Sequence, residues 1–215
     1  MIKTTLQLKS WKGRFGRKYT HRNMISLDGL EQLYKRNYGI TRTALNKLFL
    51  NKFDRSIHIL EVGCNIGNQL LCLKKMGFKN LYGIEPQNYA FRLCKKRTRN
   101  ITISKADVFN LPFEVGYFDL VFTSGILIHI NPKDIKKAMK EIYRCTKSYI
   151  WGFEYYTKRY ENVPYRGREG LLWRTDFAKL YLELFNNLKL VKEKKMKYKN
   201  NGNMDTMFLL KKVKK

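Results

Sequence analysis

The sequence predicts a doubly wound α/β fold, in which a mostly parallel sheet of seven strands carries helices on both faces. Short apolar runs alternate with helical patterns from residue 57 to residue 156, and this alternation requires right-handed crossovers between parallel strands. Residues 188–211 add two extended runs around an Asn-Gly turn, which is typical of an antiparallel hairpin at the end of a sheet. A chain of 215 residues is long enough for one such domain.

Residues 1–55 precede the predicted sheet, and we expect them to be mostly helical. One helix is expected from residue 26 or 27 to 38 and another from 41 to 51. Residues 10–23 mix aromatic side chains, glycines and cations, which suits a recognition segment, although a loop covering one sheet edge is the alternative. We therefore expect an N-terminal helical cap or lid over residues 1–55 and the main domain over 56–215.

The first strand, expected at residues 57–62, turns sharply into a helix expected from 67 to 76. The turn contains Gly63 and Gly67, and glycine suits a backbone that takes positive φ or lies against a ligand because it has no Cβ. Gly77 is expected to end the helix. A tight turn that binds nothing is the alternative.

The second strand, expected at residues 80–85, ends on a carboxylate. Glu85 follows Gly63 by 22 residues, a spacing at which an acidic residue reaches the ribose of a nucleotide lying over the first turn. The glycine spacing is G-x-x-x-G and not G-x-G-x-x-G, so we expect no pyrophosphate cradle. Pro86 is expected to open the next helix, which ends near residue 98.

The third strand, expected at residues 101–106, leads into Asp107, for which a helix N-cap role is the alternative to a binding role. The fourth strand, at 116–125, ends in Thr123, Ser124 and Gly125. Because open α/β sheets bind ligands at the carboxyl ends of their strands, we expect the active site there.

Further candidates follow the fourth strand. His129 has an ordinary pKa near ~6.5 that suits proton removal, although a structural histidine is the alternative. After a helix expected at 133–146, a fifth strand at 149–156 ends in Glu154, Tyr155 and Tyr156, which we expect beside the substrate.

A loop at residues 157–172 follows, before a helix expected at 176–186. In this loop, Arg166 and Arg168 are suited to forked contacts with phosphate or carboxylate groups. A solvated loop that binds nothing is the alternative.

The net charge of +27, from 44 basic and 17 acidic residues, favours a polyanionic partner such as nucleic acid. The alternative is that an AT-rich genome encodes many lysines, asparagines and isoleucines without selection for binding. The four cysteines lack the C-x-x-C spacing of a zinc site, so we expect no metal and reduced, structural thiols. With no apolar run long enough to span a bilayer and no secretory signal, a cytoplasmic protein is expected.

These motifs resemble, in the same order, those of the class I S-adenosylmethionine-dependent methyltransferases, which have a Rossmann-like fold. Residues 61–68 (EVGCNIGN) resemble motif I, usually E/D-x-G-x-G-x-G, with Asn65 at the middle glycine. The sequence FDLVF at 118–122 resembles motif IV. The resemblance implies S-adenosylmethionine as cofactor, with ribose at Glu85 and adenine at Asp107 and the Val108 amide. The implied cofactor-binding residues are Glu61, Gly63, Cys64, Asn65, Gly67, Glu85, Asp107, Val108 and Ser124, with Tyr19, Arg22 and Asn23 closing over the donor.

A narrower resemblance rests on WKGRFGRKYTHRN at 11–23, GILIHINP at 125–132, EYY at 154–156 and YRGREGLLW at 165–173. Together these segments resemble the methylases associated with pseudaminic acid biosynthesis. This implies a small acceptor, such as a nucleotide-linked or nonulosonic sugar.

The expected reaction is in-line transfer of a methyl group to an oxygen or nitrogen atom of a small, anionic acceptor. His129, with Glu154 or Tyr155, would take the acceptor proton. The expected substrate-binding residues are Tyr156, Arg166 and Arg168.

Three alternatives remain. An RNA or DNA methyltransferase would explain the charge, although neither an N-P-P-Y strand end nor a Pro-Cys nucleophile is present. A non-catalytic module that binds S-adenosylmethionine or nucleic acid would keep the fold. A lipid-surface acceptor could use the C-terminal lysines, although no amphipathic anchor is evident and no membrane association is expected.

Overall fold

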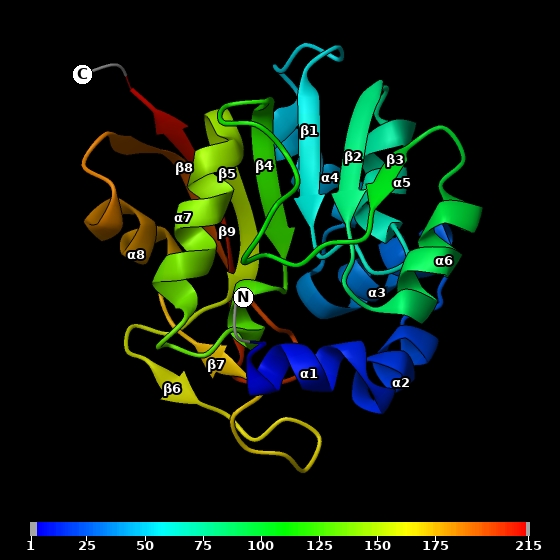
Figure 1. Ribbon diagram of the computed structural model, residues 1–215, viewed down its shortest axis with the longest axis vertical. Coiled ribbons are helices and arrows are strands. Elements are labelled where there is room, and N and C mark those ends of the chain that lie inside the picture. The colour runs from blue at the N-terminus through cyan, green and yellow to red at the C-terminus, as the bar shows by residue number, and fades with distance from the viewer. Residues whose placement is uncertain (1–3, 214–215) are drawn as a thin grey trace.

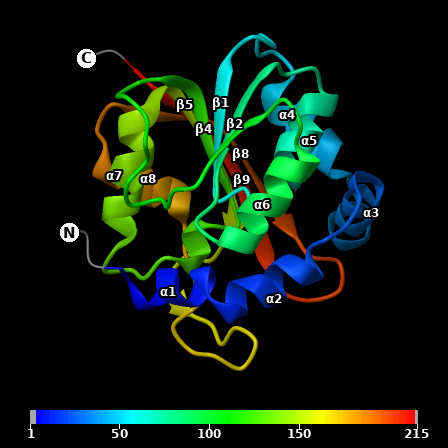
Figure 2. The same ribbon diagram turned by 45° about the vertical axis from the view of Figure 1, so that its right-hand side comes forward.

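The computed structural model describes residues 4–213 and has a central seven-stranded sheet with helices on both faces (Figures 1 and 2). The strands are β1 (His58–Val62), β2 (Asn80–Ile84), β3 (Thr102–Ser104), β4 (Phe118–Ser124), β5 (Thr146–Tyr155), β8 (Leu188–Lys197) and β9 (Met204–Lys212). Their order is β3-β2-β1-β4-β5-β9-β8, and β9 pairs antiparallel with both of its neighbours. The predicted doubly wound sheet with an antiparallel terminal hairpin is therefore confirmed.

The strand order reverses direction between β1 and β4. The chain leaves β1 toward β2 and β3 and then returns to pair β4 with the other side of β1. At such a switch point the flanking helices lie on opposite faces of the sheet, so a crevice opens at the carboxyl ends of the strands. This topology locates the site before any side chain is considered.

Two hydrophobic clusters cover the two faces of the sheet. One packs helices α7 (Ile135–Cys145) and α8 (Phe177–Leu184) against one face, and it includes the predicted buried stripe of α7. The other packs α4 (Arg42–Leu50), α5 (Asn68–Lys75) and α6 (Asn88–Arg97) against the opposite face. A parallel sheet covered on both faces in this way has strands that are apolar throughout.

One predicted boundary was wrong, and one short strand pair was not predicted. Helix α6 begins at Asn88 and not at Pro86, because the Glu85 carboxylate accepts a hydrogen bond from the Gln87 amide and the Gln87 side chain in turn caps the Ala90 amide. The segment 157–172, predicted to be a loop, also contains a strand that was not predicted. Strand β6 (Glu161–Asn162) pairs antiparallel with β7 (Trp173–Arg174), a ladder too short to show as a sequence pattern.

Of the N-terminal segment, the described residues from 4 onward form three helices before α4. Helices α1 (Leu6–Lys12) and α2 (Arg14–Arg22) lie across the carboxyl ends of the parallel strands in both ribbon views, so the segment 10–23 does not cover a sheet edge (Figures 1 and 2). Helix α3 (Leu27–Tyr38) begins after Ser26, whose side chain caps the Gly29 amide. The prediction of mostly helical structure here is confirmed.

Candidate functional site

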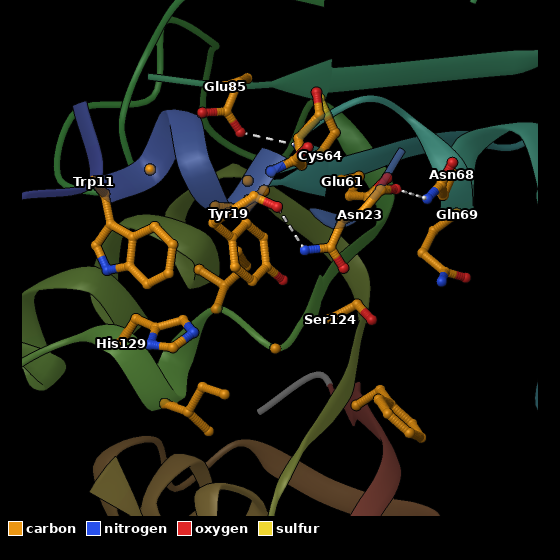
Figure 3. A pocket seen from close by; sticks show the side chains of 18 of the residues that line it. Trp11, Tyr19, Asn23, Glu61, Cys64, Asn68, Gln69, Glu85, Ser124 and His129 are labelled. Carbon is orange, nitrogen blue, oxygen red and sulfur yellow. Dashed lines mark hydrogen bonds between the residues drawn. The ribbon is translucent and has the colours of Figure 1, made fainter. Parts of the chain in front are cut away.

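A cavity of about 330 Å³, called here the main cavity, lies at the carboxyl ends of β1, β2, β4 and β5 beneath α1 and α2 (Figure 3). Most of the residues predicted to bind the cofactor line it. These are Tyr19, Asn23, Glu61, Gly63, Cys64, Asn65, Glu85, Asp107, Val108 and Ser124. The topology of the sheet brings them together from five separate segments of the chain.

The glycine turn after β1 forms part of the wall. Gly63 has φ +76°, and a Cβ built there would lie 2.4 Å from Cδ1 of Ile126. Asn65 stands where motif I has its middle glycine and also takes a left-handed conformation, with φ +47°. Asparagine tolerates this region better than most residues, so the substitution keeps the turn.

Gly67 does not line the main cavity, contrary to the prediction. It is the left-handed N-cap of α5, and a Cβ there would lie 2.4 Å from Cγ2 of Thr98 and 3.0 Å from Sγ of Cys94. Gly67 therefore serves the turn and the close approach of α5 to α6, because any side chain would separate these helices.

Glu85 is 6% exposed and lies at the end of β2. Its Oε2 accepts the Asn65 amide at 2.9 Å and its Oε1 accepts the Gln87 amide at 2.8 Å. Burial raises its pKa to about 7, although these two hydrogen bonds oppose the rise. The two amides fix the carboxyl group over the glycine turn, where the spacing predicted it.

The surroundings of Asp107 are compatible with both roles that the sequence left open. Its Oδ1 accepts the Phe109 amide at 3.1 Å, as in an N-cap or Asx turn, and the residue also lines the main cavity. Its Oδ2 lies 3.2 Å from Nζ of Lys12, at the end of α1. Lys12 was not predicted, since nothing in the sequence indicates that α1 crosses this strand end.

Aromatic rings close one side of the main cavity. The Trp11 ring centroid lies 5.1 Å from that of Tyr19 and 4.3 Å from that of His129, and the Tyr165 ring lies 5.3 Å from His129. Figure 3 shows Trp11 and Tyr19 turned into the cavity beside His129. Asn23 is held here because its Nδ2 donates to the Tyr19 carbonyl at 2.8 Å.

His129 lines the main cavity, and its protonation state is restricted. Nδ1 lies 2.7 Å from the Leu171 carbonyl, so Nδ1 carries the proton and Nε2 keeps a free lone pair. Burial lowers the His129 pKa to about 4. The imidazole is therefore neutral at pH 7, and it accepts a hydrogen bond more readily than it holds a proton.

Glu154 does not line the main cavity, so the geometry does not support its predicted catalytic role. The side chain is fully buried, and it accepts the Ile126 amide at 3.2 Å and the Ile128 amide at 3.5 Å. Burial raises its pKa to about 7. Glu154 thus holds the loop after β4, which is the floor of the cavity. This role could not be predicted from the sequence, because the alternation of side chains along a strand does not tell which of its last residues faces the ligand.

The raised pKa of Glu154 leads to a stability prediction. Since its pKa is higher in the folded than in the unfolded chain, its stabilising contribution is complete below about pH 4.5 and is lost as pH rises through about 7. The stability of wild type relative to Glu154→Gln should therefore fall by about 2 kcal/mol between pH 5 and pH 8. Urea denaturation at both pH values measures this difference in stability. The control is Glu183→Gln, because Glu183 is exposed and forms a surface ion pair with Lys179. The same difference at both pH values would contradict the assignment.

A polar cluster that the sequence did not indicate lies at another part of the wall. Asp205, on β9, is fully buried, and its Oδ2 accepts the Tyr38 hydroxyl and, at 3.1 Å, the Tyr198 hydroxyl. Its Oδ1 has no hydrogen-bond partner, and burial raises its pKa to about 7. Tyr155, predicted to be catalytic, lines the cavity beside this cluster, and its ring lies 6.4 Å from that of Tyr198.

Besides Gly67 and Glu154, four predicted residues lie outside the main cavity. Tyr156 packs against Lys195, whose Nζ lies 4.2 Å from the ring centroid. Arg22, Arg166 and Arg168 line a separate, cationic cavity on the outer side of α2. Arg22 is therefore absent from the lining of the main cavity, although its guanidinium carbon lies 5.9 Å from the ring centroid of Tyr19.

The cysteines are free and buried, as predicted. Cys64 lines the main cavity with its Sγ 3.7 Å from that of Cys94, and this contact together with burial raises the Cys64 pKa. A thiol with a raised pKa is a poor nucleophile, so Cys64 acts by packing. Among residues 4–213, no helix combines the length and apolarity needed to cross a bilayer.

The main cavity fits S-adenosylmethionine, which has a nucleoside part and a charged amino-acid part. Among the described residues, ten buried side-chain polar atoms lack a hydrogen-bond partner, and five of them belong to residues that line this cavity. They are Trp11 Nε1, Glu61 Oε2, Asn65 Oδ1, Gln69 Oε1 and Asp205 Oδ1. Because unpaired buried polar groups are costly, their concentration here indicates a polar ligand.

Comparisons with known proteins agree with this fit. Residues 60–149 match a family model described as a methyltransferase domain. A protein of Encephalitozoon cuniculi named as a methyltransferase is 27% identical over 132 residues, which is 58% of each chain. The chain thus spans a little more than half the length of this relative.

Solved structures share the fold. Magnesium protoporphyrin IX methyltransferase from Synechocystis, solved with bound S-adenosylmethionine, has a TM-score of 0.71 at 10% identity and covers 98% of this chain and 97% of its own. The [4+2]-cyclase SpnF has a TM-score of 0.63 at 14% identity, and the match covers 87% of this chain and 97% of SpnF. One fold therefore serves different reactions.

Residues 60–149, from β1 into β5, match a methyltransferase domain, and the chain shares its fold with solved S-adenosylmethionine-dependent methyltransferases. At this domain the residues that line the main cavity fit S-adenosylmethionine as the cofactor.

Proposed function

We propose that this chain transfers a methyl group from S-adenosylmethionine to an oxygen or nitrogen atom of a small, anionic acceptor. The observation that carries the proposal is that one cavity joins the donor-type residues at the ends of β1 and β2 to polar side chains of α3, β5 and β9, among them Asp205 with its unpaired Oδ1. The bound cofactor supplies an electrophilic methyl group on a good leaving group. The protein then mainly has to align the acceptor and exclude water.

In this proposal the predicted roles on the donor side are kept where the residue lines the main cavity. Gly63 and Cys64 cradle the methionine part, Glu85 holds the ribose, and Asp107 with the Val108 amide holds the adenine. Tyr19 and Asn23 close over the donor from α2. Lys12 would leave Asp107 Oδ2 when adenine binds, since the ion pair is partly exposed and weak.

On the acceptor side, we assign the proton to the Tyr38–Asp205–Tyr198 cluster. A general base works best when its pKa lies near the operating pH, and the Asp205 pKa of about 7 meets this condition while the His129 pKa of about 4 does not. The acceptor proton would pass through a tyrosine hydroxyl to Asp205. His129 would orient the acceptor through the free lone pair of Nε2.

The resemblance to the methylases associated with pseudaminic acid biosynthesis supports a sugar acceptor, nucleotide-linked or nonulosonic. The alternative of an RNA or DNA acceptor is supported by the net charge of +27. We also propose a cytoplasmic location, which four unpaired cysteines support, and a division into a cap of residues 1–55 and a catalytic domain of residues 56–215.

Calorimetric titration with S-adenosylmethionine and S-adenosylhomocysteine tests the donor assignment. We expect Asp107→Ala and Glu85→Ala each to weaken donor binding by ~1 to 3 kcal/mol through lost hydrogen bonds. Glu114→Ala is the matched control, because Glu114 is exposed and lies outside the main cavity. Unchanged affinity in both Asp107→Ala and Glu85→Ala would exclude the proposed donor site.

A further inference from the structure

A second cavity, of about 430 Å³, is surrounded by positive charge. We call it the cationic cavity. Three cations come from α2 and two from the loop between β6 and β7. Its lining residues are Arg14, Phe15, Lys18, Arg22, Arg166 and Arg168. No carboxylate contributes to this lining, so five positive groups face one another across a concave surface.

Within the described part of the chain, residues 4–213, none of these five cations takes part in an ion pair. Arg14, Lys18 and Arg22 follow one another at intervals of four residues, which places them on one face of α2. Like charges at this spacing repel one another and destabilise a helix. An anion bound between them would remove this repulsion.

The loop that supplies the other two cations is held against α2. The Tyr165 amide donates to the Arg168 carbonyl at 2.8 Å, closing a two-residue turn in which Arg166 has φ +52° and Gly167 has φ +72°. The Arg168 guanidinium lies 5.2 Å from the ring centroid of Phe15, on α2. Figure 1 shows this loop, in yellow, beside α1, and Gln7 of α1 donates to the Gly170 carbonyl at 3.1 Å.

The cationic cavity adjoins the acceptor end of the main cavity. The Phe15 ring lies 5.1 Å from Trp11 and 6.0 Å from Tyr165, and both of those rings line the main cavity with His129. A molecule whose reacting group contacts His129 therefore needs to pass only this aromatic wall to place another group among the arginines.

We propose that the cationic cavity binds phosphate groups of the acceptor, so that the substrate class is a phosphorylated or diphosphate-bearing small molecule. Guanidinium groups match the geometry of phosphate oxygens with two parallel hydrogen bonds, and five cations exceed what a single carboxylate would neutralise. The inference rests on the proposed function, since it makes this cavity the anchor of the acceptor. It adds Arg14 and Lys18 to the predicted pair Arg166 and Arg168, and it reassigns Arg22 from donor to acceptor.

Titration with inorganic pyrophosphate, measured by calorimetry on the full chain saturated with S-adenosylhomocysteine, tests this inference. We expect pyrophosphate to bind more tightly than orthophosphate, and the double variant Arg14→Gln/Arg168→Gln to weaken its binding by at least about tenfold. The matched control is Lys136→Gln/Lys140→Gln, which removes the same charge from the exposed side of α7, outside both cavities. The control should bind pyrophosphate as wild type does.

Equal weakening in both double variants would overturn the proposal, because it would reduce the effect to net charge. Absence of pyrophosphate binding would also overturn it. If a single-stranded RNA oligonucleotide bound in a manner that depends on Arg14 and Arg168 while pyrophosphate did not, a nucleic-acid partner would replace the small acceptor. Titration with S-adenosylmethionine, run on the same variants, should be unaffected. If wild type did not bind S-adenosylmethionine, the proposed function would fail, whatever the result with pyrophosphate.

Discussion

Gly63→Ala should weaken binding of S-adenosylmethionine by at least about tenfold. The alanine would pay the cost of a left-handed backbone, about 1 to 2 kcal/mol, and its Cβ would also lie 2.4 Å from Cδ1 of Ile126. Relief of that contact requires a shift of either the glycine turn or Ile126. Both line the main cavity, so the cradle for the donor changes shape.

Gly116→Ala separates these two effects. Gly116 also has positive φ, +66°, but a Cβ there would have its nearest neighbour at 3.9 Å, on Lys147. We expect Gly116→Ala to lose about 1 to 2 kcal/mol of unfolding free energy, Gly63→Ala to lose at least as much, and only Gly63→Ala to lose donor affinity. Calorimetry and urea denaturation of the two variants measure this. Wild-type donor affinity in Gly63→Ala would mean that the ligand does not lie against this turn.

Asp205→Asn should lower kcat by at least about 10²-fold, the usual contribution of a general base, while donor affinity stays the same. In wild type the rate should rise with pH through about 7, because Asp205 must lose its proton before it can accept one from the substrate. The asparagine cannot titrate, so this rise should disappear. The assay is release of S-adenosylhomocysteine with the acceptor found by screening phosphorylated sugars and nucleotide sugars.

Two further measurements distinguish a proton acceptor from a structural carboxyl group. The carboxyl ¹³C resonance of Asp205 should titrate near pH 7 in wild type, which needs no acceptor. Asp119→Asn is the matched control, because Asp119 caps the start of β1 through the His58 amide, at 2.9 Å, and lies outside the main cavity. A pH profile with the same rising limb in Asp205→Asn would assign the proton to another group.

The groups proposed to face the acceptor were harder to find in the sequence than those proposed to hold the donor. The proposed donor residues follow strand ends at short, regular intervals, and the sequence therefore indicated that Glu85 and Asp107 lie at the same edge of the sheet. The Tyr38–Asp205–Tyr198 cluster joins Tyr38 of α3 to Asp205 of β9, which are 167 residues apart in the sequence. No local pattern marks such a pair, because only the insertion of β9 between β5 and β8 brings Asp205 to the cavity wall.

Glu154 and Gly67 illustrate a second reason why sequence patterns were insufficient. Both residues are next to site residues in the sequence, yet both stabilise the surrounding structure. Glu154 accepts hydrogen bonds from amides of the loop after β4, and Gly67 allows α5 to approach α6. A residue next to a ligand and a residue that supports the neighbouring turn have the same spacing in sequence. Their directions differ only after the chain has folded.

By itself, the sequence determined the alternating strands and helices, the antiparallel terminal hairpin, the glycine turn and the donor-type carboxylates. These follow from local physics: apolar periodicity, the freedom of glycine at positive φ, and parallel strands that end at the same edge of a sheet. Only the tertiary structure decided how α1 and α2 cross the strand ends, which groups face the acceptor, and that five cations share one concave surface. Those features depend on packing between segments far apart in the chain, and the free energy of such packing is not encoded in any single stretch of residues.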